Sequence, residues 1–111
     1  KVLNDNGSIV LHDCNPLSEQ HVVPYEVYLK RRGHWNGTVW KSIVNVRLNR
    51  PDLAVFVVDT DWGCGVLRRG EQVVYRDPSV PEKEIYSFEY LKKHRKTLMT
   101  LISVYQFKKM F

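Results

Sequence analysis

The strongest fold signal in the chain is the stretch LAVFVVDTDWGCGV at residues 53–66. Its first six residues are apolar without alternation, which is typical of a strand buried on both faces of a sheet. Residues 59–63 are rich in turn formers, and the residues from Cys64 to Arg68 predict a second strand. The stretch therefore predicts an antiparallel hairpin within an α/β sheet.

A helix and another strand precede this hairpin. Residues 39–49 carry apolar side chains at helical spacing, with Thr38 as a candidate N-cap and Pro51 as the stop. Residues 8–13 begin with a second continuous apolar run, which again predicts a strand buried on both faces. Two strands that flank a helix imply a right-handed parallel crossover. Residues 17–36 are expected to form a loop with one irregular helical turn.

The C-terminal third predicts a short edge strand, a linker and a long helix. These are expected at residues 72–75, 77–86 and 87–109, and the helix has an apolar stripe interrupted at Arg95. The predicted fold class is α/β, with a mixed sheet of three or four strands in residues 3–76, a terminal antiparallel hairpin and two main helices. The whole chain, residues 1–111, is expected to be one domain.

Composition restricts the class of protein. With 111 residues, 43% of them hydrophobic and 26% charged, the chain has an ordinary globular composition. The net charge is +5 and the basic excess lies mainly in the C-terminal helix, which favours a solvated helix face over a nucleic-acid site. Cys14 and Cys64 form no CxxC pair and are expected to be free thiols in the cytoplasm. The sequence contains no apolar run of roughly 20 residues, so no membrane partner is expected.

Three segments resemble the last third of class I S-adenosylmethionine-dependent methyltransferases that modify sugars or small molecules. They read GSIVLHDCNP at residues 7–16, WNGTVWK at 35–41 and RPDLAVFVVDTDWGCGV at 50–66. The likeness covers roughly residues 3–70 and implies the fifth, sixth and seventh strands of a Rossmann-like sheet. It implies the C-terminal portion of an O-methyltransferase that acts on a sugar or small-molecule hydroxyl. The isolated chain is expected to be inactive.

The donor site of that family is not recognisable in this chain. The family holds S-adenosylmethionine with a glycine-rich loop after its first strand, where backbone N–H groups approach the ligand. None of the six glycines here forms such a loop, and the pair Gly63 and Gly65 lies between two late strands. S-adenosylmethionine is therefore expected only in a full-length parent. Strand 8–13 would then present an open apolar edge, and a homodimer through this edge is expected.

His12 and Asp13 lie where the predicted strand 8–13 ends, the position at which open α/β sheets bind ligands. A His–Asp pair there is a candidate general base for an acceptor hydroxyl. The resemblance also makes Asp13, with Asn15, a candidate oxygen ligand for Mg²⁺. The alternative is that Asp13 and Asn15 only satisfy backbone groups of a turn. The candidate acceptor-binding residues are Asn15, His34 and Trp35, and the aromatic faces of the last two suit sugars and planar rings.

Two other function classes stay open. The chain is also compatible with a non-catalytic interaction module that binds an acidic partner through its basic helix. Asp59 and Asp61 follow an apolar strand, as do the metal-binding carboxylates of glycosyltransferases that take a sugar nucleotide with Mn²⁺. That pair defines the third hypothesis, a glycosyltransferase-like fragment.

Overall fold

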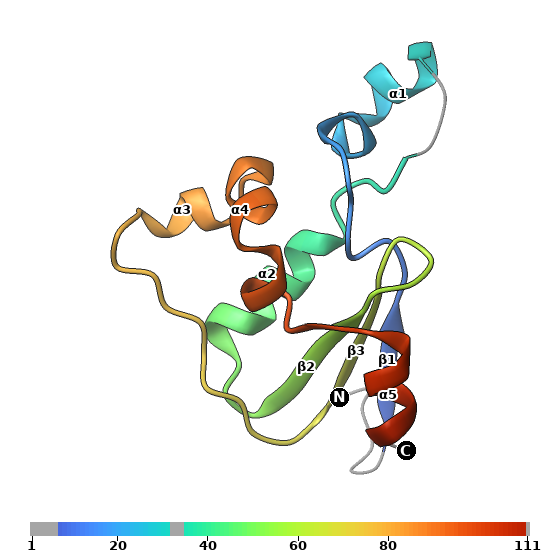
Figure 1. Ribbon diagram of the computed structural model, residues 1–111. Coiled ribbons are helices and arrows are strands. Elements are labelled where there is room, and N and C mark those ends of the chain that lie inside the picture. Colours follow the sequence, from blue (N-terminus) through green and yellow to red (C-terminus); the bar gives the residue numbers. More distant parts are fainter. Residues whose placement is uncertain (1–6, 32–34, 111) are drawn as a thin grey trace.

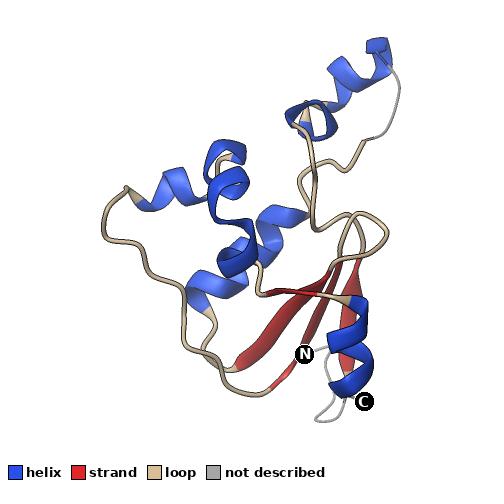
Figure 2. Ribbon diagram, in the orientation of Figure 1, coloured by secondary structure: helices blue, strands red, loops and turns tan. Residues whose placement is uncertain are grey.

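A computed structural model describes residues 7–31 and 35–110 and contains a four-stranded sheet with helices on both of its faces (Figures 1 and 2). The elements in chain order are β1 (Ser8–Leu11), the 3₁₀ turn η1 (Glu19–Val22), α1 (Tyr25–Arg31), α2 (Trp40–Asn49), β2 (Leu53–Val58), β3 (Cys64–Arg69), α3 (Glu82–Ile85), α4 (Phe88–Leu98), β4 (Leu101–Ile102) and α5 (Val104–Met110). The predicted α/β class with a mixed sheet is confirmed.

The strands lie in the order β1-β3-β2-β4. β3 pairs antiparallel with both β1 and β2, so β1 and β2 run in the same direction with β3 between them. The hairpin predicted from residues 53–66 is confirmed, with Val58 opposite Cys64 next to the turn. β4 adds a short parallel pairing to the far side of β2, from Val57 and Val58 to Leu101 and Ile102.

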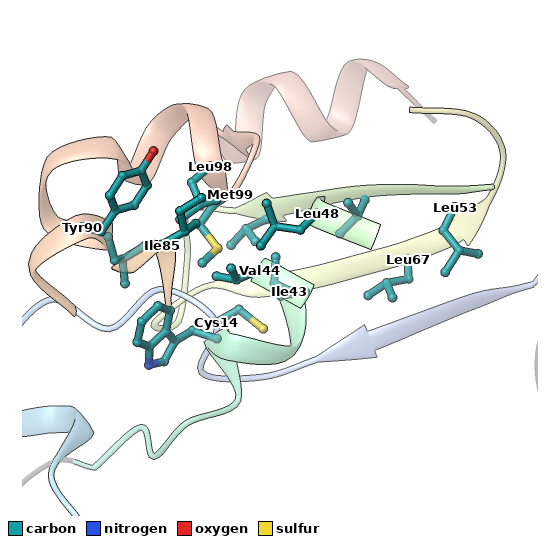
Figure 3. Packing of buried hydrophobic residues seen from close by; sticks show 14 residues of the cluster. Cys14, Ile43, Val44, Leu48, Leu53, Leu67, Ile85, Tyr90, Leu98 and Met99 are labelled. Atoms are coloured by element: carbon teal, nitrogen blue, oxygen red, sulfur yellow. The ribbon is translucent and has the colours of Figure 1, made fainter. Parts of the chain in front are cut away.

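The main core lies between the sheet and the helices α2 and α4. Helix α2 buries Trp40, Ile43, Val44 and Leu48, whose spacing of three and four residues places them on one face. Figure 3 shows three of these side chains facing the sheet and the end of α4. A smaller cluster on the other face contains Phe56, and Phe107 of α5 packs on it with ring centroids 6.1 Å apart.

Arg47 joins three parts of the chain beneath this core. Its guanidinium donates to the carbonyls of Thr97 and Leu98 at the end of α4, at 3.3 and 2.9 Å. It also donates to Gln72 Oε1 at 2.6 Å and to the Val73 carbonyl at 3.2 Å. Residues 70–81, called the strap below, are thereby held against α2, which explains why the predicted edge strand 72–75 does not form.

The first predicted strand is shorter and less buried than expected. β1 ends at Leu11 because Asp13 adopts a left-handed backbone with φ of 62°. Val10 is 55% exposed, so the expectation that this strand is buried on both faces is wrong. The reason is its position at the edge of the sheet, where only the face carrying Ile9 and Leu11 packs against the main core.

The predicted helix over residues 87–109 is broken into α4, β4 and α5. The chain leaves the helix after Met99, which is fully buried, and Thr100 takes a left-handed φ of 46°. The carbonyls of Thr100 and Ile102 then accept hydrogen bonds from the N–H groups of Val57 and Asp59. Satisfying this open side of β2 overrides the helical pattern of the segment.

Three smaller expectations also differ from the structure. The predicted linker 77–86 contains α3, which buries Ile85 in the main core. The predicted loop 17–36 contains η1 and α1. Thr38 does not cap α2, because the N-cap position is Val39 and makes no side-chain capping bond. Among the described residues, none of the helices has both the length and the apolarity that crossing a membrane requires.

The open edge of β1 predicts self-association of this chain. β1 has no strand on its outer side within residues 7–31 and 35–110, and it carries no charge or proline that would block pairing. We expect light scattering at high micromolar concentration to give more than the monomer mass. Val10→Lys should restore the monomer, whereas Val73→Lys, on the 90% exposed strap position, should not. A monomeric unsubstituted chain would contradict this prediction.

Candidate functional site

The loop after β1 is clamped to the turn after β2. The backbone N–H of Cys14 donates to the Gly63 carbonyl at 3.0 Å, and that of Asn15 donates to the Trp62 carbonyl at 2.8 Å. The turn has three successive left-handed residues, Asp61, Trp62 and Gly63, with φ of 51°, 65° and 90°. These bonds continue the β1–β3 contact beyond the strand ladder, so the two sequence motifs form one structural unit.

Two glycines of that unit make room for neighbouring protein atoms. A Cβ on Gly63 would lie 2.5 Å from both the backbone nitrogen and the Cβ of Asn15. A Cβ on Gly65 would lie 2.9 Å from Cys14 Sγ and from Ile43 Cδ1. The space that these glycines leave open is therefore filled by the chain itself, and they do not form a ligand loop.

Asp13 is held in one orientation at the end of β1. The Asn36 amide donates to Asp13 Oδ1 at 3.0 Å, and Asn36 is buried and donates its own backbone N–H to the His21 carbonyl at 2.7 Å. Left-handed backbone in a non-glycine residue costs about 1 kcal/mol or more and is concentrated at functional sites. The carboxylate stays half-exposed, and the neighbouring His12 is exposed.

Asn15 lies in a different network from Asp13. Arg95 of α4 donates through Nη1 to Asn15 Oδ1 and to the Pro16 carbonyl, the latter at 2.7 Å. Asn15 Nδ2 is 3.5 Å from Asp59 Oδ1. Burial lowers the pKa of Arg95, and the charge of Asp59 opposes that shift. The amide oxygen of Asn15 thus faces a cation, so Asn15 and Asp13 do not present their oxygens to one common ligand.

Arg95, like Asn36, is a residue of this site that the sequence did not predict. Its signal was present, because it interrupts the apolar stripe of the predicted helix 87–109. A cation at an inward-facing position of a helix needs a polar partner, and the loop 14–16 supplies it from 80 residues away in sequence.

Aromatic side chains pair within residues 21–35 and with the turn after β2. The Trp35 indole N–H donates to the Val23 carbonyl at 2.8 Å, and its ring lies 5.3 Å from that of Tyr25. His21 meets Trp62 edge to face, with ring centroids 4.9 Å apart. Trp35 therefore borders the segment that holds Asp13, through its neighbour Asn36. His34 lies outside the described residues.

The carboxylates Asp59 and Asp61 are both exposed in the turn after β2. Within the part of the chain that the structure describes, no three His, Cys, Asp or Glu side chains come together as a metal site. Asp59 is directed to Asn15, and Asp61 sits in the left-handed turn that clamps the loop after β1. The geometry thus gives both residues a role in the turn.

Comparisons with known proteins returned no match for this chain among family models, curated proteins or solved structures. The resemblance to methyltransferases therefore rests on the three sequence motifs. The structural support for that resemblance is limited to the geometry at the ends of β1 and β2 within the described residues.

The clamp makes Gly63 the most sensitive glycine of the site. Gly63→Ala places a methyl group against the Asn15 backbone in a left-handed conformation, and we expect a loss of about 2–4 kcal/mol in the free energy of unfolding. Gly70→Ala is the control, because its Cβ would meet the Ala54 methyl at 3.2 Å and the Ala54 backbone nitrogen at 3.9 Å, which is milder crowding than at Gly63. Urea denaturation followed by circular dichroism measures both losses. Equal losses in the two variants would argue against the clamp.

The two thiols should differ strongly in reactivity. Cys14 is fully buried, and burial raises the pKa of its thiol to about 11, whereas Cys64 is half-buried. Because the thiolate is the reactive form, iodoacetamide at pH 8 should modify Cys64 and spare Cys14 in the folded chain. Mass spectrometry of peptides would show this, and unfolding in urea should make both thiols reactive. Fast labelling of Cys14 in the folded chain would show that the site opens.

Proposed function

We propose that this chain is the C-terminal portion of a class I S-adenosylmethionine-dependent O-methyltransferase that acts on a hydroxyl of a sugar or small metabolite. β1, β2 and β3 would be the fifth, sixth and seventh strands of its Rossmann-like sheet. The observation that carries the proposal is the fixed orientation of Asp13 by Asn36 at the carboxyl end of β1.

Asp13 and His12 would act on the proton of the acceptor hydroxyl. The Asp13 carboxylate keeps Oδ1 on the Asn36 amide and remains half-exposed, so it can accept a hydrogen bond from an incoming hydroxyl. His12 is adjacent and exposed, and an imidazole takes up a proton near neutral pH. Trp35 would border the acceptor, and Asn15 would fix the loop that carries Asp13. His34, which lies outside the described residues, is proposed as an acceptor-binding residue from the sequence alone. The general base would leave an oxygen nucleophile ready for methylation.

The G-x-G pair at Gly63 and Gly65 does not form a loop that could approach the methyl donor. Gly63 and Gly65 form the only G-x-G pair of the chain, and protein atoms of Asn15, Cys14 and Ile43 fill the space beside them. We therefore derive no methyl-transfer step from this chain. The donor would be bound by another part of the parent enzyme, and the isolated chain would be inactive.

Asp13 would be the protein ligand of a divalent cation. The Asp13 carboxylate accepts from Asn36 and is half-exposed, and Mg²⁺ takes one or two protein carboxylates with water as its other ligands. We place the parent enzyme in the reducing cytoplasm, because both cysteines are free thiols.

Binding of S-adenosylhomocysteine should distinguish the isolated chain from the complete parent enzyme. We expect calorimetric titration of the folded chain to give no heat, and titration of the complete gene product to give a micromolar Kd. The complete product should also transfer a labelled methyl group to a sugar or small-molecule hydroxyl.

Asp13→Asn should lower that transfer rate about 10²–10⁴-fold without changing the Kd for S-adenosylhomocysteine, because it removes only the base. Asp61→Asn, in the turn after β2, serves as the matched control and should leave both quantities unchanged. A complete gene product that fails to bind S-adenosylhomocysteine would refute the proposal.

A further inference from the structure

The charge of this chain is strongly asymmetric along its length. Glu89 is the last acidic residue, and six of the seventeen lysines and arginines follow it. The residues up to Glu89 carry the other eleven cations and all twelve carboxylates, so they are close to neutral. The positive charge of the molecule is therefore concentrated on α4, β4 and α5. Arg95 is the one of these cations that points inward, and the remaining five, all lysines, are exposed.

These three elements meet at the β4 edge of the sheet (Figure 1). The carbonyls of Thr100 and Ile102 point to β2, where they accept from Val57 and Asp59. Because backbone groups of successive strand residues point to opposite sides, the N–H and C=O of Leu101 point away from the sheet. Within the described residues, β4 has no strand on this outer side. The edge therefore offers one donor and one acceptor to an extended backbone.

A hollow lies at each end of β4, and each has a volume of about 290 Å³. The hollow beside Thr100 is largely apolar, and its lining includes Val55, Phe56, Ile102 and Met110. The hollow beside Ser103, called the polar hollow below, has a larger share of polar side chains. Its lining includes Lys96, Ser103 and Gln106 next to the apolar Leu101 and Ile102. The two hollows also contain one carboxylate each, Glu71 in the apolar one and Asp59 in the polar one.

The surroundings of Glu71 and Asp59 favour the polar hollow as the site for an anionic side chain of a binding partner. Asp59 is 3.5 Å from the Asn15 amide and lies in the field of Arg95, which offsets its charge. Lys96 in the same hollow has no carboxylate within ion-pair distance among the described residues. Glu71 at the apolar hollow repels an acidic group there, and Arg47, the cation that lines this hollow, already donates its hydrogen bonds to protein acceptors. Gln106 and Met110 are four residues apart on α5, so one face of that helix borders both hollows.

We propose that the β4 edge binds an extended peptide that carries an acidic residue and an apolar residue, as a fifth strand of the sheet. Its backbone would pair with Leu101, its carboxylate would lie in the hollow of Lys96, and its apolar side chain would fill the hollow of Met110. Strand addition of this kind takes affinity from main-chain bonds and specificity from pockets at the edge. This inference does not depend on the proposed methyltransferase.

The observations favour a peptide over a nucleic acid. Binding of single strands relies on aromatic side chains on which bases stack, together with a groove that tracks phosphates. Phe56 is the one aromatic residue in the linings of these two hollows and it is buried, and their exposed cation is Lys96. A free strand edge next to an apolar hollow is instead suited to a polypeptide backbone.

The test uses a fluorescein-labelled peptide in which glutamate and valine alternate, titrated with the chain while fluorescence anisotropy is recorded. The Val10→Lys variant serves as the background, because it blocks the rival edge at β1. We expect saturable binding that weakens steeply with added salt. Lys96→Glu should weaken it at least 10-fold, and Lys41→Glu, exposed on α2, should leave it unchanged. Circular dichroism confirms that each variant is folded.

Two further probes decide between outcomes. A peptide of the same sequence with alternate backbone nitrogens methylated on its pairing side should lose binding, because strand pairing needs those N–H groups. An oligo-dT of similar length should bind more weakly than the peptide. Equal binding of the methylated peptide, tighter binding of the oligonucleotide, or no effect of Lys96→Glu would each overturn the proposal.

Discussion

The rest of the structure depends on the two backbone hydrogen bonds by which the loop after β1 grips the turn after β2. They join Cys14 and Asn15 to the carbonyls of Gly63 and Trp62. Through them, β1 is fixed to β3 beyond the four residues of its ladder, and Arg95 can reach Asn15 from α4. Since a side chain at position 63 would occupy the same space as Asn15, these two hydrogen bonds require glycine there. The orientation of Asp13 depends on this geometry as well.

The elements that the sequence predicted well are those whose pattern is local. β2, β3 and α2 were found within one residue of their ends, because an unbroken apolar run, a turn and a helical stripe each show within a short window. The break between α4 and α5 was not found. Residues 87–109 keep a helical pattern through that point. The helix ends there because the N–H groups of Val57 and Asp59, more than 40 residues away, bond to carbonyls of this segment.

In the candidate site, too, the locally encoded features were predicted and those set by distant contacts were not. His12 and Asp13 were predicted because a strand end is visible in the sequence, and the structure places both at the end of β1. The partners that orient the loop were not predicted, since Asn36 and Arg95 reach it through tertiary contacts 23 and 80 residues apart. The sequence pattern shows such a contact only indirectly, as it does where the charged Arg95 interrupts an apolar stripe.

Arg47 has a consequence for how the molecule opens. Its one guanidinium satisfies the last carbonyls of α4 and two groups of the strap while its own backbone belongs to α2. Local unfolding of any one of these segments would leave a half-buried cation without its acceptors, which is costly. The three segments should therefore exchange their amide hydrogens as one cooperative unit, although they are separated by up to 51 residues in sequence. The arm that carries α1 lies outside this unit and is free to exchange independently (Figure 1).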